Sequence, residues 1–106
     1  MARVALVTGG SRGIGAAISV ALKNAGYTVA ANYAGNDEAA AKFTAETGIK
    51  TYKWSVADYD ACVAGIAQVE ADLGPVAVLV NNAGITRDAM FHKMTPVQWK
   101  EVIDTN

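Results

Sequence analysis

The feature that most constrains this chain is a glycine-rich segment between an apolar run and a helical pattern. The segment Thr8-Gly9-Gly10-Ser11-Arg12-Gly13-Ile14-Gly15 follows Val4-Ala5-Leu6-Val7. A strand that turns through glycines into a helix presents the first helical amides to an anion. Gly9 permits a sharp exit from the strand, Gly13 lets the backbone approach a pyrophosphate, and Gly15 allows the helix to pack against the sheet. The segment predicts a phosphate site, with a plain glycine turn that binds nothing as the alternative.

Segments with strand and helix patterns alternate along the chain. We expect strands and helices, in chain order, over Val4–Thr8, Gly13–Ala25, Thr28–Tyr33, Asp37–Thr47, Lys50–Val56, the stretch from the capping residue Asp58 to Leu73, and Val76–Val80. Such alternation implies right-handed βαβ units and a parallel sheet. The expected fold is α/β, a Rossmann-type three-layer α/β/α arrangement with sheet order 3-2-1-4, the first half of a doubly wound sheet. The capping box Thr95-Pro96-Val97-Gln98 predicts one further helix.

Two of these helices carry a predicted buried face. In the first, the apolar positions are Ile14, Ile18, Ala21, Leu22 and Ala25; in the third, they are Tyr59, Cys62, Val63, Ile66, Val69 and Leu73. Cys62 is the single cysteine, so it cannot form a disulfide within the chain. We expect it to be a small buried apolar residue, because no His or Lys flanks it to lower its pKa.

Composition excludes several classes of function. Apolar residues make up 52% and charged residues 18% of the 106 residues, which suits one packed domain over 1–106. With a net charge of −1 and no basic stripe, nucleic-acid binding and membrane docking are not expected. The N-terminal apolar run is too short for a signal peptide or a membrane span, so we expect a cytoplasmic protein. No metal site is expected.

A second motif, Asn81-Asn82-Ala83-Gly84, follows the last predicted strand. With the glycine segment it resembles the short-chain dehydrogenase/reductase family, over essentially all 106 residues, and implies a partial dinucleotide-binding domain. The resemblance implies cofactor contacts at Gly9, Ser11, Arg12, Gly13, Ile14 and Gly15, with Asn82, Ala83, Gly84 and Ile85 along the ribose and nicotinamide side. It also implies an adenine contact after the third strand, where Ser55, beside Val56, stands in place of the family's common Asp.

The residues at the end of the second predicted strand bear on the choice of cofactor. NAD-specific enzymes usually place an acid there, on the ribose 2′-hydroxyl. Here Asn32 or Tyr33 holds that place, and Asp37 is expected to begin the next helix. Arg12 can pair bidentately with a 2′-phosphate. We therefore expect NADP(H) in preference to NAD(H), the alternative for Arg12 being a solvated side chain.

The last residues narrow the resemblance. Ile85-Thr86-Arg87-Asp88 and Ile103-Asp104-Thr105-Asn106 are similar to the branch of the family that reduces 3-oxoacyl thioesters, above all acetoacetyl-CoA in polyhydroxyalkanoate synthesis. This implies an acyl-CoA substrate, with Asp88 near its entrance; a loop residue paired with Arg87 is the alternative.

Catalysis in the family uses a tyrosine acid, a lysine four residues later, a serine and an asparagine. Asn106 matches the asparagine, but no tyrosine of this chain has a lysine four places on. We expect the N-terminal portion of a reductase, inactive alone. We also expect a homo-oligomer, because the apolar strand Val76–Val80 would lie at a bare edge. A dinucleotide-binding module without chemistry and a self-associating fragment are the alternatives.

Overall fold

The computed structural model describes residues 3–82, which form one parallel sheet with helices between its strands. The sheet has four strands in the order β3-β2-β1-β4, as predicted, and every pairing is parallel. The elements are β1 (Val4–Val7), α1 (Gly13–Asn24), β2 (Thr28–Tyr33), α2 (Asp37–Thr47), β3 (Lys50–Lys53), α3 (Tyr59–Leu73) and β4 (Val76–Val80).

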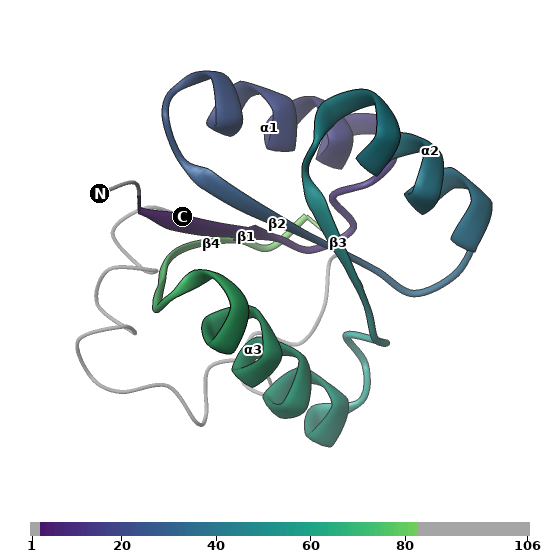
Figure 1. Ribbon diagram of the computed structural model, residues 1–106. Coiled ribbons are helices and arrows are strands. Elements are labelled where there is room, and N and C mark those ends of the chain that lie inside the picture. The colour runs from purple at the N-terminus through teal and green to yellow at the C-terminus, as the bar shows by residue number, and fades with distance from the viewer. Residues whose placement is uncertain (1–2, 83–106) are drawn as a thin grey trace.

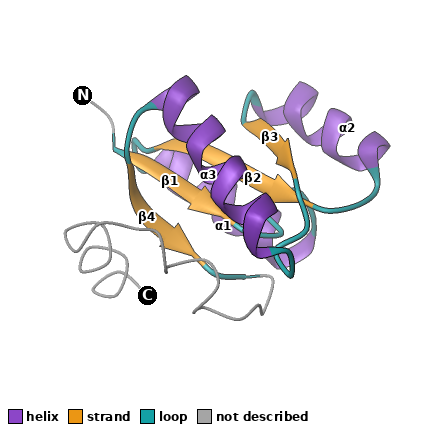
Figure 2. Cartoon of the chain, turned by 90° about the horizontal axis from the view of Figure 1, so that it is seen from below, coloured by secondary structure: helices purple, strands orange, loops and turns teal. Residues whose placement is uncertain are grey.

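Helices cover both faces of the sheet, which makes the three-layer fold expected from the sequence. Figure 1 shows α1 and α2 on one face and α3 on the other, and Figure 2 shows α3 in front of the strands. Each face has its own apolar cluster: Leu6, Trp54 and Val69 on the α3 side, and Val7, Val29 and Phe43 on the α1 and α2 side. All four residues of β1 are buried, as a central parallel strand requires.

Three element ends differ from the prediction. β1 ends at Val7 and α1 at Asn24, each one residue early. β3 ends at Lys53, three residues early, because the chain turns there. The Ser55 hydroxyl accepts from the amide of Ala57 at 3.3 Å, and the Asp58 amide donates to the carbonyl of Ser55 at 3.1 Å. These local bonds replace the sheet pairing that the apolar pattern predicted.

The predicted buried face of α1 was wrong in part. Ile14 is 75% exposed, and Ala21 and Ala25 are exposed, whereas Ile18 and Leu22 are half-buried as expected. The buried positions are Gly15 and Ser19. A residue without a side chain and a small one let the helix approach closely, so the true inward face is marked by small residues rather than by large apolar ones.

The predictions for α3 are confirmed. Its predicted face is buried or half-buried throughout, and Asp58 caps the helix by accepting from the amide of Ala61 at 3.0 Å. Cys62 is fully buried, and burial raises the pKa of its thiol, with a smaller lowering from a hydrogen bond to Trp54. This thiol is a packing group, as the sequence indicated.

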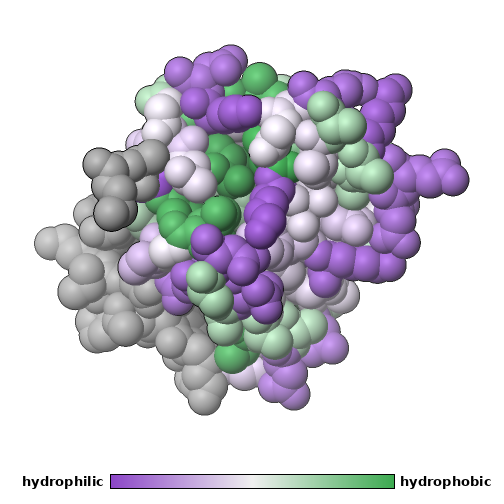
Figure 3. Space-filling view, viewed as in Figure 1, coloured by the Kyte–Doolittle hydropathy of each residue, from purple (hydrophilic) through white to green (hydrophobic). Residues whose placement is uncertain are grey.

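The outer side of α2 is covered by hydrophilic side chains (Figure 3), where Lys42 and Glu46 form an exposed pair at 3.8 Å.

Within residues 3–82 no helix is long and apolar enough to cross a membrane. Among the described strands, β4 pairs with β1 and forms one edge of the sheet. The predicted self-association at this edge stays a prediction. The helix predicted from the Thr95 capping box lies outside the described residues.

Candidate functional site

The glycine segment forms a tight turn from β1 into α1 at the carboxyl edge of the sheet. Gly9 and Gly13 adopt left-handed backbone conformations, with φ of 60° and 53°. A Cβ on Gly15 would stand 2.0 Å from the carbonyl oxygen of Gly9. Gly15 is therefore required where the start of α1 approaches the turn. Gly10 is also close-packed, since its Cβ would lie 2.8 Å from the carbonyl oxygen of Val7.

Asn32, in β2, holds this turn in place. Its side chain donates to the carbonyl of Trp54 at 3.0 Å and accepts from the amide of Gly9 at 3.3 Å. The residue is only 2% exposed; its bond to Trp54 is buried, and its bond to Gly9 is partly buried. Asn32 thereby joins the turn to the ends of β2 and β3. Its role in the structure is to position the turn, and its predicted contact with a cofactor stays a prediction.

Two further side chains hold the turn. The Ser19 hydroxyl, buried on α1, donates to the carbonyl of Gly10 at 3.0 Å, and the Asn82 amide donates to the carbonyl of Gly9 at 3.2 Å. The segment after β4 thus contacts the glycine turn through Asn82. We call Asn32, Ser19 and Asn82 the turn clamp. They reach the turn from β2, from α1 and from the end of β4.

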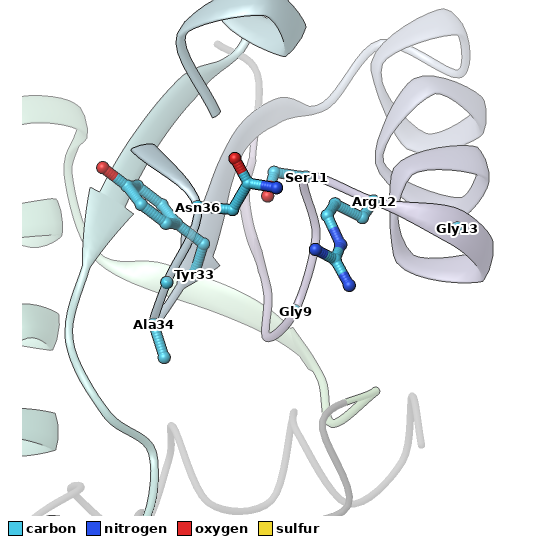
Figure 4. Close-up of a pocket in the computed structure, with 8 residues that line it drawn as sticks. Gly9, Ser11, Arg12, Gly13, Tyr33, Ala34 and Asn36 are labelled. Atoms are coloured by element: carbon cyan, nitrogen blue, oxygen red, sulfur yellow. The ribbon is translucent and has the colours of Figure 1, made fainter. Parts of the chain in front are cut away.

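A cavity of about 650 Å³ lies between the turn and the loop after β2, a size typical of small-molecule sites. Figure 4 shows the Arg12 guanidinium and the Asn36 amide turned toward this space. The cavity is lined by Gly9, Ser11, Arg12, Gly13, Tyr33, Ala34, Gly35 and Asn36. It therefore brings together five of the residues that the sequence analysis selected: Gly9, Ser11, Arg12, Gly13 and Tyr33.

The start of α1 differs from the starts of the other two helices. Asn36 and Asp58 cap α2 and α3 with side-chain oxygens, and both helices have acidic residues in the first turn. Arg12, at the N-cap of α1, makes no capping bond with its side chain, and the first turn of α1 has no acid. The first intrahelical bond runs from Ala16 to Arg12, so the amides before Ala16 are left for another acceptor. An anion at this end of the cavity would supply it.

The charges around the cavity favour an anion. Arg12 is the one charged residue among those that line it, and no carboxylate is among them. Asp37 follows directly, as the first residue of α2, where the sequence placed it. Its carboxylate pairs with Lys53 at 3.1 Å and accepts from the Tyr33 hydroxyl at 3.0 Å. Hydrogen bonds from Lys53 and Tyr33 lower the pKa of Asp37.

The other predicted residues lie outside this cavity or outside the described part. Gly15 is buried behind the turn, and Ile14 is exposed at the start of α1. Ser55 is exposed after β3 with its hydroxyl engaged in the local turn, and Val56 packs against the α3-side cluster. The remaining predicted residues lie outside the described residues: Ala83, Gly84, Ile85, Asp88 and Asn106. Within residues 3–82 no group of acidic, His and Cys side chains is placed to hold a metal.

Three lining residues were not predicted from the sequence: Ala34, Gly35 and Asn36. Asn36 has a positive φ of 57°, and its side chain accepts from the amide of Ala39 at 3.0 Å. An Asn just before an acidic first turn is a capping signal, and it could have marked this loop as a helix start that faces the glycine turn.

Comparisons with known proteins agree with this geometry. A family model described as short chain dehydrogenase matches residues 3–106. An acetoacetyl-CoA reductase of Paracoccus denitrificans is 88% identical over the whole chain, which covers 44% of that protein. A 3-oxoacyl-[acyl-carrier-protein] reductase of Staphylococcus aureus is 46% identical, again over the whole chain and 45% of the relative. The chain thus spans less than half the length of these curated relatives.

A solved structure also matches the fold of this chain. The crystal structure of BdcA in complex with NADPH matches with a TM-score of 0.66 and 40% identity, over 78% of this chain and 32% of that one.

Proposed function

Because the chain belongs to the short-chain dehydrogenase family, we propose that its cavity binds a nicotinamide dinucleotide with the pyrophosphate at the start of α1. The observation that carries this proposal is the uncapped first turn of α1, beside a cavity with one cation and no carboxylate among its lining residues. Gly13 leaves open space where a side chain would stand, so a phosphate can approach its backbone. The residues present fit the cofactor that the family implies.

We propose further that NADP(H) is preferred to NAD(H). β2 ends at Tyr33 without an acid. No carboxylate at the strand end is therefore present to bind the ribose 2′-hydroxyl of NAD or to repel the 2′-phosphate of NADP. Ser11, Arg12 and Asn36 line the same end of the cavity and offer polar contacts to such a phosphate. That BdcA was solved with NADPH supports the preference, because that protein has the same fold.

Replacing Arg12 tests this preference. We expect Arg12→Ala to weaken binding of 2′,5′-ADP about tenfold, because a hydrogen bond to a charged group is worth about 1.5–3 kcal/mol. Binding of 5′-AMP, which has a 2′-hydroxyl, should change much less. Titration calorimetry with both probes measures the two affinities. Lys42→Ala, on the exposed face of α2, is the control. Equal loss for both probes would contradict a 2′-phosphate contact at Arg12.

The reaction we propose for the whole protein is reduction of a 3-oxoacyl-CoA such as acetoacetyl-CoA. The acetoacetyl-CoA reductase of Paracoccus denitrificans, at 88% identity, is the main support. NADPH would supply the hydride, and the described residues would bind and orient it. Protonation of the new alkoxide needs an acid. Among the 106 residues no tyrosine precedes a lysine by four places, so we propose that these residues bind cofactor without reducing the ketone.

NADPH oxidation with acetoacetyl-CoA tests this reaction. We expect residues 1–106 to bind NADPH and to leave its absorbance at 340 nm unchanged when the thioester is added. A longer chain that continues as in the relatives should oxidise it. Turnover by the 106 residues alone would contradict the assigned need for a Tyr and Lys pair. Binding without turnover in both chains would favour a dinucleotide-binding module, and no binding in either would favour a self-associating fragment.

A further inference from the structure

Asp37 is the acidic residue that is nearest in sequence to the residues lining the cavity. It comes directly after the lining residue Asn36. It does not itself line the cavity. Lys53, at the end of β3, contacts both of its oxygens, with Nζ 3.1 Å from Oδ1 and 3.2 Å from Oδ2. Tyr33, which does line the cavity, donates its hydroxyl to Oδ1 at 3.0 Å. The carboxylate is thus held by Lys53 and Tyr33.

The direction of Tyr33 supports this placement. Figure 4 shows the Tyr33 hydroxyl pointing away from Arg12 and Asn36. A carboxylate bound to that hydroxyl is drawn to the outer side of the loop. Freed from Lys53, Asp37 would be an uncompensated negative charge beside a site that we assign to a phosphate. It would also be an acceptor for a ribose hydroxyl, which is the role an acid after β2 has in NAD-specific proteins.

We propose that Lys53 determines cofactor specificity as a positioning residue, by holding the Asp37 carboxylate outside the cavity. This inference rests on the proposed function, since it concerns the 2′-phosphate end of the same site. Lys53 acts through Asp37 and need not touch the cofactor. As a consequence, Asp37 does not favour NAD over NADP, although it lies close to the end of β2 in the sequence.

A second ion pair on the same strand offers a matched control. Lys50, at the other end of β3, lies 3.2 Å from Asp72 on α3. The two lysine side chains are similarly exposed, 58% for Lys50 and 54% for Lys53. Lys50→Gln removes the same charge from the same strand without touching Asp37. A general loss of positive charge therefore affects both variants, and a specific effect affects only Lys53→Gln.

The experiment compares binding of 2′,5′-ADP with binding of 5′-AMP in 20 mM salt, for wild type, Lys53→Gln, Lys50→Gln, Asp37→Asn and the Asp37→Asn/Lys53→Gln double variant. We expect Lys53→Gln to reduce the preference for 2′,5′-ADP about two- to fivefold, as suits an exposed pair. Lys50→Gln should leave the preference unchanged. In the Asp37→Asn background, Lys53→Gln should have no effect, because the carboxylate it restrains is gone.

Each other outcome has a definite meaning. An equal effect of Lys53→Gln with and without Asp37 would mean that Lys53 meets the phosphate directly, which overturns the proposal. A wild type that prefers 2′,5′-ADP but shows no difference between Lys53→Gln and Lys50→Gln also overturns it and leaves the proposed function intact. A wild type that binds neither probe overturns both. Thermal unfolding of each variant confirms that the fold is retained.

Discussion

Replacing Gly15 with alanine should strongly destabilise the chain and abolish tight cofactor binding. The new Cβ would stand 2.0 Å from the carbonyl oxygen and 2.8 Å from the carbonyl carbon of Gly9, and 2.7 Å from the Asn82 amide nitrogen. Two of these three atoms are backbone, so α1 or the turn itself must move. Overpacking of this kind costs about 1–3 kcal/mol and sometimes more. Urea unfolding should show this loss, and 2′,5′-ADP should bind at least about tenfold more weakly, a factor equal to about 1.4 kcal/mol.

Two other glycines give a graded control. Gly35→Ala places its Cβ in open space in the same cavity, so stability should stay within about 0.5 kcal/mol of wild type. Gly13→Ala also meets no atom, but its φ of 53° penalises a side chain by about 1–2 kcal/mol. The expected order of stability is Gly35→Ala, then Gly13→Ala, then Gly15→Ala. A Gly15→Ala variant as stable as Gly35→Ala would contradict the close approach of α1 to the turn.

Replacing Asn32 should lower the free energy of unfolding by a similar amount, because hydrogen bonds are lost rather than because atoms clash. Asn32→Ala leaves the partly buried amide of Gly9 and the buried carbonyl of Trp54 without their present partner. Each such loss costs about 1–3 kcal/mol, so we expect a decrease of about 2–4 kcal/mol in the free energy of unfolding. Asn24→Ala, at the exposed end of α1, should change it by less than about 0.5 kcal/mol.

The Asp variant at the same position makes the loss depend on pH. In Asn32→Asp the second oxygen faces the carbonyl of Trp54, and only the protonated carboxyl can donate to it. Burial favours the neutral form, so the pKa of this carboxyl in the folded state should exceed its unfolded value of about 4. The folded state then binds the proton more tightly than the unfolded state does. The free energy of unfolding therefore falls as pH rises above the unfolded pKa. Unfolding in urea from pH 4 to pH 8 measures the trend; constant stability would contradict the assigned donor.

The sheet order and most element bounds could be predicted from the sequence, because they depend on patterns within each segment. Parallel pairing follows from alternating strands and helices, the 3-2-1-4 order is the one typical of a sheet that begins with a glycine turn into a helix, and the cap at Asp58 marks the start of α3 locally. The end of β3 could not be predicted in the same way. Trp54 is buried and apolar, yet it lies past the strand because Ser55 starts a turn.

The site was predictable where one segment encodes it and not where distant segments meet. The glycine turn was found because its residues are consecutive. The place of Asn32 at the end of β2 predicts a cofactor contact, but its partners, Gly9 and Trp54, are each more than twenty residues away. Likewise nothing in a helical periodicity indicates that α1 approaches the turn through Gly15 and Ser19. Such contacts depend on tertiary packing, which a local pattern does not encode.

The turn clamp and the cavity lining are made of different residues. Asn32, Ser19 and Asn82 hold the turn and do not line the cavity, whereas Ser11, Arg12 and Gly35 line it at exposed or half-buried positions. For these residues, ligand preference and fold integrity are therefore encoded at separate positions. In a saturation mutagenesis of this chain, Ser11, Arg12 and Gly35 should tolerate exchange and yield altered cofactor choice. The clamp should tolerate almost none, so such a protein can acquire a new cofactor over successive substitutions while it stays folded at every step.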